Sequence, residues 1–391
     1  MQTSVLVKNS LVVQKFKAFQ YYISCYAETF KKRLLKAFVK FKVASLKFAK
    51  QQVYIGPYFS NLGGVSHHLQ SLSSYSEIRS QTLPSHSFLS FLQRHQLIDY
   101  YKSCLERHNF GKQVLHTHVD PWFIDVCKKA QQQGSYWVHT YHTLYFEKDW
   151  NNGLEDWQKN INKALIEVAR YADVKIAISH WLKAHLKKTY NIDTVYIPNG
   201  VNVEKCDKAK AERFISKHKL KDFILFASGI SDIKNSGMFL QLAQSMPEYP
   251  FVIIGRGISK QKLEEKFEVP LGANITVFGT MTHNDLLDAI AACKVFVVTS
   301  RSEGLPTVLM EAMALERSVV GVNTFGTKEV IHSDAYGYLY KVDDLADLIA
   351  KTQQAYQHSK GPLARQRILE AYDWRVVIPK IDTIYKELLN G

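Results

Sequence analysis

Runs of four or five apolar residues recur along the chain after residue 50, and segments with helical periodicity separate them. Such runs are typical of parallel strands that are buried between helices on both faces of a sheet. The pattern therefore predicts an α/β fold with parallel sheets. The expected strands form two series, first 53–56, 114–116, 136–139, 174–178 and 195–197, and then 223–226, 251–254, 275–278, 295–298 and 319–322.

A turn signal, Pro198-Asn199-Gly200, lies between the two series of strands. Proline and glycine interrupt regular structure, so the segment predicts a hinge. We expect two doubly wound, Rossmann-like domains that face a cleft, over 51–198 and 199–370, followed by a C-terminal helix over 371–391. In sheets of this kind ligands bind beyond the carboxyl ends of the strands, so the chemistry should lie in the loops that follow them.

The first 50 residues have a different pattern. Eleven Lys or Arg residues against one acid, Glu28, give this segment +10 of the chain's net charge of +14. On a helical wheel the large apolar residues gather on one side and the lysines on the other: Phe30, Leu34, Phe38, Phe41 and Phe48 against Lys32, Lys36, Lys40, Lys47 and Lys50. We predict a basic amphipathic helical extension over 1–50, which suits an anionic membrane surface. Packing against the chain's own body or a second copy is the alternative. A nucleic acid is not expected as a partner, because no RNA- or DNA-binding motif accompanies the charge.

Composition narrows the class of protein. The 391 residues are 46% apolar and 22% charged, with 10 Pro and 19 Gly, which excludes a mainly disordered or collagen-like chain. The five cysteines form no CxxC pair, so a disulfide framework and a structural zinc site are not expected. No apolar run approaches the roughly 20 residues of a spanning helix, and no signal-peptide pattern is present. We expect a cytoplasmic protein, peripheral on the inner face of a membrane.

The segment after the strand at 295–298 carries the densest chemistry. Pro306 suits the first turn of a helix, so the N–H groups of Thr307 and Val308 would be free there. Together with the positive end of the helix dipole they form a ready site for a phosphate. Glu303 and Glu311 flank that site and would hold the hydroxyls of a sugar and a ribose. The alternative is that Glu303 caps the helix and Glu311 is a solvated surface residue.

Two loops after other strands add candidates. Gly63 and Gly64 let the backbone turn sharply and approach a ligand without a Cβ in the way, although an ordinary strand-to-helix turn would use them as well. Lys234 follows the strand at 223–226, where its ammonium group would neutralise a leaving diphosphate, unless it is one more solvated lysine.

Histidines crowd the strand ends of the N-terminal domain, namely His116, His118, His139 and His142. Imidazole is a common metal ligand, but these histidines have no cysteine partners and lie on separate expected strands. We therefore expect no metal site. An isolated histidine at a strand end is more often structural than catalytic.

The motifs taken together resemble those of the retaining GT-B glycosyltransferases of family 4, over roughly residues 51–391. Glu303 and Glu311 match the family's E-x7-E motif. The other matches follow in order: Asn61-Leu62-Gly63-Gly64-Val65, Tyr141-His142-Thr143, Ile197-Pro198-Asn199-Gly200-Val201, Gly255-Arg256-Gly257, Phe278-Gly279-Thr280-Met281 and Trp374 in the final helix. The resemblance says nothing about residues 1–50.

The resemblance implies a reaction and roles for residues. A sugar would pass from a nucleoside diphosphate sugar (a UDP- or GDP-sugar) to an acceptor hydroxyl on a glycan or glycolipid, with net retention, without a covalent nucleophile, and without a metal or other cofactor. His142, Lys234 and Glu303 would be the catalytic residues, and the final helix would cross back to the N-terminal domain. The donor site would comprise Gly63, Gly64, Lys234, Arg256, Thr280, Met281, Glu303, Gly304, Leu305, Pro306, Thr307, Val308 and Glu311.

One position departs from the family pattern. Family members usually carry an arginine just after Gly229, where this chain has Ile230, and the spacing from that glycine to Lys234 is about one residue short. Arg256 or Arg301 would have to supply the missing cation. The departure keeps open a non-catalytic scaffold, and another GT-B activity, a nucleotide-sugar epimerase, is the second alternative. The base, sugar and acceptor are not encoded in recognisable residues, because this fold reads the base largely through main-chain groups.

Overall fold

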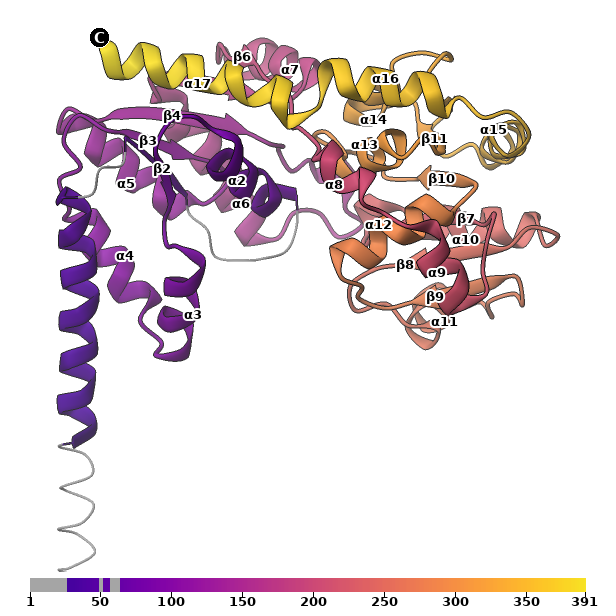
Figure 1. The fold of residues 1–391 in the computed structure, drawn as a ribbon, viewed down its shortest axis with the longest axis horizontal. Coiled ribbons are helices and arrows are strands. Elements are labelled where there is room, and N and C mark those ends of the chain that lie inside the picture. The colour runs from indigo at the N-terminus through magenta and orange to yellow at the C-terminus, as the bar shows by residue number, and fades with distance from the viewer. Residues whose placement is uncertain (1–26, 49–51, 57–63) are drawn as a thin grey trace, which may run out of the picture.

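The computed structural model describes residues 27–48, 52–56 and 64–391, which form two lobes side by side, with the N-terminal helix projecting from the first of them (Figure 1). Each lobe contains one parallel sheet of six strands with helices on its faces. The predicted α/β fold with two doubly wound sheets is thus confirmed.

The N-terminal sheet has the strand order β2-β1-β3-β4-β5-β6, and every pair is parallel. Its strands are β1 Val53–Gly56, β2 Ser80–Thr82, β3 Val114–Thr117, β4 Tyr136–Tyr141, β5 Val174–Ala177 and β6 Val195–Tyr196. The helices of this lobe are α2 Gly64–Tyr75, α3 His86–Arg94, α4 Ile98–Glu106, α5 Pro121–Gln132, α6 Asp156–Lys163 and α7 His180–Tyr190.

The C-terminal sheet has the order β12-β11-β10-β7-β8-β9, again parallel throughout. Its strands are β7 Ile224–Ala227, β8 Phe251–Ile254, β9 Ile275–Phe278, β10 Val295–Val298, β11 Ser318–Val322 and β12 Tyr338–Tyr340. The helices that follow the first lobe are α8 Val203–Asp207, α9 Ala211–His218, α10 Ser236–Ser245, α11 Lys260–Phe267, α12 His283–Ala292, α13 Thr307–Ala314, α14 Phe325–Ile331, α15 Leu345–Gln357, α16 Gly361–Ala371 and α17 Trp374–Asn390.

Two strands, β2 and β12, were not predicted, and both lie at a sheet edge. Each is three residues long, and the Ser80-Gln81-Thr82 strand is polar and only partly buried. The polar composition of β2 and the three-residue length of β12 explain why neither forms a run of four or five apolar residues. The ten predicted strands are all present, with bounds that shift by one or two residues at some ends.

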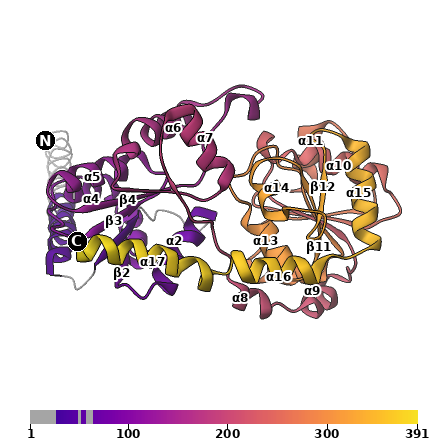
Figure 2. The ribbon, with the colours of Figure 1, turned by 90° about the horizontal axis from the view of Figure 1, so that it is seen from above.

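The chain crosses between the lobes twice, and the two crossings lie against each other. Val201 and Asp373 form an isolated parallel bridge, and the Val201 amide donates to the Tyr372 carbonyl at 2.7 Å. A Cβ on Gly200 would lie 2.5 Å from the Trp374 ring, so only glycine fits under that side chain. Beyond this point α17 returns over the N-terminal lobe, where Trp374, Val377 and Ile381 join a core with residues of β1 (Figure 2).

The N-terminal extension is helical over residues 27–44 and ends in a 3-10 turn, Ser45–Phe48. The helix has two apolar faces, whereas the wheel indicated one. Leu35, Val39 and Val43 pack into the core of the N-terminal lobe. The face predicted from the wheel stays outside: Phe30, Leu34, Phe38 and Phe41 are 57, 57, 41 and 68% exposed. Packing against the chain's own body therefore leaves this outward face largely uncovered. Residues 1–26, and Lys50 of the predicted basic face, lie outside the described residues.

Candidate active site

Three adjoining cavities lie along the junction of the two lobes. A central cavity of about 440 Å³ is lined by both lobes and shares Lys234 with a cavity of about 600 Å³ in the C-terminal lobe. It shares Gly64 and Thr307 with a third cavity of about 240 Å³. The predicted residues His142, Glu303, Gly304, Leu305, Pro306 and Val308 line the central cavity. Arg256, Thr280 and Met281 line the cavity of about 600 Å³, and Glu311 lines the cavity of about 240 Å³. The structure thus gathers every described residue predicted for the site, while Gly63 lies outside the described residues.

Lys234 and Glu303 form an ion pair at the floor of the central cavity. The Lys234 Nζ lies 2.5 Å from the Glu303 Oε1, and the two side chains are 31% and 17% exposed. The Thr299 hydroxyl donates to the Lys234 carbonyl at 2.9 Å, which fixes the loop after β7 against the loop after β10. Glu303 therefore does not cap the following helix. It holds an ammonium group where the carboxyl ends of two neighbouring strands meet.

Helix α13 points its N-terminus into the same cavity. Pro306 is the N-cap residue, one position before its predicted place in the first turn, and no side chain caps the helix. Thr307 and Val308 both line the cavity, so their orphan amide groups and the helix dipole supply positive potential there. An ammonium group and a helix N-terminus around one cavity are suited to a phosphate group.

Glu311 accepts a hydrogen bond from His283, a residue that the sequence did not point to. The His283 Nε2 lies 2.7 Å from the Glu311 Oε1, and the Lys205 ammonium group donates to the His283 Nδ1 at 2.7 Å. Since the Nδ1 accepts from a cation, the Nε2 carries the proton that reaches the carboxylate. Glu311 is thereby oriented in the third cavity and is not a solvated surface residue.

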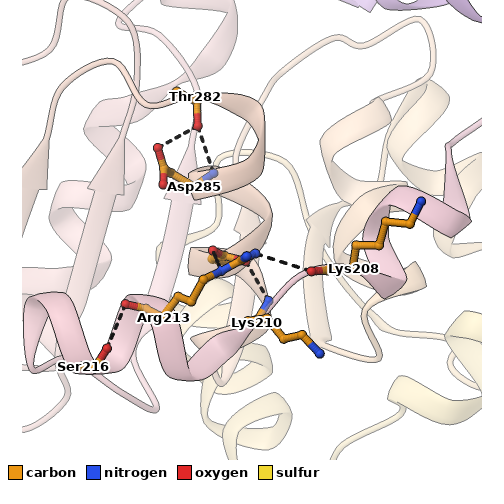
Figure 3. Close-up of polar contacts among 7 residues, drawn as sticks. Lys208, Lys210, Arg213, Ser216, Thr282 and Asp285 are labelled. Carbon is orange, nitrogen blue, oxygen red and sulfur yellow. Dashed lines mark hydrogen bonds and ion pairs between the residues drawn. The ribbon is translucent and has the colours of Figure 1, made fainter.

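The start of α12 explains why His283 is held there. The Thr282 hydroxyl accepts from the Asp285 amide at 3.2 Å and donates to the Asp285 carboxylate at 2.6 Å, which caps the helix (Figure 3). Arg213 of α9 binds both carboxylate oxygens of Asp288 further along α12, at 2.6 Å each. The Thr-x-x-Asp cap just after the Thr280-Met281 loop was the sequence signal that could have indicated a histidine at a cavity wall.

His142 belongs to a group of buried histidines. Its Nε2 lies 2.8 Å from the Nδ1 of His118, and His68 packs edge-on against it with ring centroids 4.8 Å apart. Burial lowers the pKa of His142 and of His118 well below the usual range, and the neighbouring histidines lower both further. Burial lowers the pKa of His68 to about 4, against a small opposing effect of Asn199. These imidazoles are therefore neutral near pH 7.

His68, His118 and His142 offer ligand atoms within 4.8 Å of one another, although sequence spacing indicated no metal site. The 2.8 Å between the His118 and His142 nitrogens is a hydrogen-bond distance. Two nitrogens that bind one tetrahedral zinc ion at about 2.0–2.1 Å would lie further apart, at about 3.3 Å. The geometry fits a hydrogen-bonded pair better than a set of metal ligands.

Gly304 brings the two lobes into direct contact at His142. A Cβ on Gly304 would overlap the His142 carbonyl oxygen, at a separation of 2.0 Å. The indole of Trp181 donates to the Gly304 carbonyl at 3.1 Å, and Glu329 of α14 accepts from the His180 amide at 2.8 and 2.9 Å. The close approach requires glycine, and the contacts around it connect the N-terminus of α7 to the C-terminal lobe.

Ile230, at the position where family members usually carry an arginine, lies in a cavity with two basic side chains. Ile230, Lys234 and Arg256 line the same cavity of about 600 Å³. Arg301, in contrast, faces Asp343, with 3.5 Å between its Nε and the carboxylate. Among the described side chains, none forms an ion pair with Arg256. Of the two arginines, Arg256 and not Arg301 lines a described cavity together with Lys234.

Comparison with protein families assigns both lobes. Residues 63–205 match the model described as Glycosyltransferase Family 4, and residues 207–374 match Glycosyl transferases group 1. The chain belongs to the group 1 glycosyltransferases. The two matched regions correspond to the two lobes, and residues of both regions line the cavity that contains His142, Lys234 and Glu303.

Several curated proteins are similar to this glycosyltransferase. Sulfoquinovosyl transferase SQD2 of Arabidopsis thaliana is 29% identical over 41% of the chain and 32% of its own length. Phosphatidyl-myo-inositol mannosyltransferase of Mycobacterium tuberculosis is 26% identical over 56% of the chain and 60% of its own length. The chain therefore spans about a third to three fifths of the length of these relatives.

Solved structures share the fold. HepE from Anabaena, in a complex with UDP and glucose, has a TM-score of 0.68 at 16% identity, over 86% of this chain and 99% of its own. Sucrose-phosphate synthase from Thermosynechococcus elongatus has a TM-score of 0.66 at 17% identity, over 86% and 98%. At these identities the likeness concerns the arrangement of the two lobes.

Proposed function

We propose that this glycosyltransferase transfers a sugar, with retention of anomeric configuration, from a nucleoside diphosphate sugar to a hydroxyl of a membrane-associated glycolipid or lipid-linked glycan. The observation that carries the donor half of the proposal is the Lys234–Glu303 ion pair beside the N-terminus of α13. Negative charge grows on the leaving diphosphate in such a reaction, and preorganised positive groups stabilise it most effectively in a cleft that excludes water.

Each cavity has a part in the proposed reaction. The base would lie in the cavity lined by Thr280 and Met281, and the ribose beside Glu311. The diphosphate would then reach Lys234 and α13, and the sugar would extend toward Glu303 and His142. The central cavity adjoins both of the others, because it shares Lys234 with the cavity of Thr280 and Met281 and shares Gly64 and Thr307 with the cavity of Glu311.

Retention is supported by the scarcity of a free base or nucleophile. Among the described residues that line the central cavity, Glu303 is the one carboxylate, and Lys234 already pairs with it. His142 is a poor proton acceptor, because burial depresses its pKa. The leaving phosphate itself would take the acceptor's proton, on the same face of the sugar that it departs from. No metal or further cofactor enters this scheme.

The acceptor proposal rests on the extension. Helix 27–44 exposes Phe30, Leu34 and Phe41, and carries six basic residues against one acid. No helix among the described residues is long and apolar enough to cross a bilayer. The exposed apolar face with basic flanks suits the surface of an anionic membrane, which would place the enzyme peripherally on the inner face. Some relatives are named for lipid-linked acceptors, such as the phosphatidyl-myo-inositol mannosyltransferase.

The test is thermal unfolding of the full chain with UDP, GDP, ADP and CMP, beside Glu311→Ala. A nucleotide at 100 times its Kd adds about 2.7 kcal/mol to the stability of the domain that binds it. One nucleotide should raise Tm by several degrees, at about 2–4 °C per kcal/mol, and Glu311→Ala should lose the rise. Proton NMR of the product made from the matching UDP- or GDP-sugar then gives the anomeric configuration.

The alternatives give other results in the same experiments. A shift with none of the four nucleotides would mean that Ile230 has cost the chain its donor site, which favours a scaffold. Conversion of the donor sugar without any acceptor would favour an epimerase. Failure of the full chain to sediment with anionic liposomes at physiological salt would remove the membrane from the proposal, and would leave sugar transfer untouched.

A further inference from the structure

An apolar groove separates the projecting helix from the body of the N-terminal lobe. It measures about 380 Å³ and lies between helix 27–44 and α3, with β2 at its base. Phe38, Val43 and Leu46 of the extension form one wall, and Phe88, Phe91 and Tyr101 form the other. Pockets of a few hundred Å³ with mostly apolar walls are typical of sites for small apolar ligands.

The groove is continuous with the exposed face of the helix. Phe38 lines the groove, is 41% exposed and also belongs to the outward stripe with Leu34 and Phe41. Its ring packs edge-on against Phe88 and Phe91, with centroids 6.3 and 5.2 Å apart. Phe38 therefore connects the two: a surface in contact with the outward stripe also reaches the opening of the groove at Phe38.

Two lysines lie at the groove and beside it. Lys42 is the one charged residue among its described lining residues, and its ammonium group lies 5.7 Å from the centre of the Phe38 ring. Lys36 lies over the ring of Tyr100, 5.2 Å from its centre, on the neighbouring helix α4. Apolar walls with ammonium groups at one side match an amphiphile that has a hydrocarbon chain and an anionic headgroup.

We propose that the groove binds one hydrocarbon chain of an anionic phospholipid of the membrane, with the lipid phosphate near Lys42. The proposal rests on the membrane contact in the proposed function, but not on the transfer reaction. The groove shares no lining residue with the three cavities of the candidate active site. The ligand is therefore a lipid of the bilayer that anchors the enzyme, and not the acceptor.

The test uses the full chain and vesicles of phosphatidylcholine mixed with phosphatidylserine, at physiological salt. Some phosphatidylserine carries a photoreactive group at the end of one acyl chain. After illumination, mass spectrometry should find the label on the groove residues Phe38, Val43, Leu46, Phe88 and Phe91. Label confined to Phe30, Leu34 and Phe41 would overturn the proposal, because the chains would then touch only the outward stripe. The same holds if residues 1–26 fill the groove and no lining residue is labelled.

A matched pair of variants tests the groove by filling it. Ser87→Trp places an indole in the groove, and Gln93→Trp places the same ring on α3 outside it, at another exposed position. The indole of Ser87→Trp would keep part of the lipid chain out of the groove, and the loss of two buried CH2 groups weakens binding about tenfold. Ser87→Trp should therefore bind vesicles about tenfold more weakly than Gln93→Trp. Equal vesicle affinity of the two variants would overturn the proposal. Thermal unfolding establishes that both variants fold.

Two further arms separate the groove from the membrane contact and from the acceptor. A short-chain photoreactive phosphatidylserine, used below its micelle concentration, should label the groove without any vesicle. Groove labelling in a protein that fails to bind vesicles would reject the membrane contact alone. A Ser87→Trp variant with unchanged vesicle affinity but a raised KM for a lipid acceptor would assign the groove to the acceptor, and so overturn the proposal.

Discussion

Lys234 and Glu303 lie 69 residues apart in the chain, and yet their side chains meet at 2.5 Å. They come from the loops after β7 and β10, which are adjacent strands of the C-terminal sheet. The pair occupies the point where the central cavity meets the cavity of Ile230 and Arg256. Any diphosphate bound there shares the ammonium group with Glu303, so the two residues should act as a unit.

That coupling predicts non-additive losses of activity. Lys234→Ala and Glu303→Gln should each lower kcat/KM about 10²–10³-fold, as removal of one group that stabilises transition-state charge does. The double variant should be little worse than either single variant. Steady-state kinetics with the nucleotide sugar that raises Tm measures all three.

The matched control is the pair of Lys260 and Glu264 on α11, which are 61% and 33% exposed, whose charged atoms are 3.8 Å apart and which line none of the cavities described above. Lys260→Ala and Glu264→Gln should leave kcat/KM unchanged. Losses from Lys234→Ala and Glu303→Gln that simply multiply in the double variant would show that the two residues act independently.

Much of this architecture is visible in the sequence, for a physical reason. Central strands such as β8 and β10 are buried on both faces, so they must be continuous apolar runs. Loops after such strands carry the site, and Glu303, Lys234 and His142 were found there. The strands β2 and β12 were missed because neither forms such a run: β2 is polar, and β12 is only three residues long.

The remaining features depend on contacts between distant segments. His283 meets Glu311, and His68 meets His142, only after the chain has folded. Helix 27–44 also has an inward apolar face with Val39 and Val43. Lysines adjoin these valines on the helical wheel, so the face is not conspicuous in the sequence. Large aromatic residues are the most conspicuous apolar residues on a helical wheel. The wheel therefore indicated the aromatic face, which the fold leaves exposed.

The contact between Gly304 and His142 predicts a defect of closure. Gly304→Ala would force a Cβ against the His142 carbonyl, so the lobes should move apart and water should enter the cleft. We expect kcat/KM to fall about 100-fold, because small misplacements of catalytic groups have effects of that size. Nucleotide binding to the C-terminal lobe, measured by the rise in Tm, should persist. Loss of the Tm rise together with activity would instead indicate local damage to the loop.

The His118–His142 hydrogen bond predicts a positioning role for His118. The bond fixes which nitrogen of His142 carries the proton, and hence what that ring offers to the sugar. His118→Leu should lower kcat about tenfold with little change in the donor KM, in line with the loss of one hydrogen bond to a buried group. His118→Asn, which keeps a hydrogen-bonding group near the Nδ1 position, should recover most of the rate. Equal rates of the two variants would contradict a role through that bond.

Buried histidines make the stability of the N-terminal lobe sensitive to acid. Burial lowers the pKa of His139 to about 3 and of His68 to about 4, and moves those of His116, His118 and His142 in the same direction. In the unfolded chain the pKa of histidine is about 6.5. At pH values below this, the histidines bind protons in the unfolded chain but stay neutral in the folded lobe. The free energy of unfolding should therefore fall as the pH drops below about 6.5, by up to about 1.4 kcal/mol per pH unit for each such histidine, and should be constant above it.

His68→Phe isolates one of these histidines. Neither ring nitrogen of His68 has a hydrogen-bond partner within bonding geometry, and the ring packs among His118, His142 and Trp374, so phenylalanine fits its shape at little cost. Urea unfolding at pH 7 should give similar stability for both proteins. Between pH 6 and pH 5 the variant should lose stability less steeply, by up to about 1.4 kcal/mol per pH unit, because one fewer proton binds on unfolding. Parallel pH profiles would mean that His68 is protonated in the folded lobe, against the direction that its burial requires.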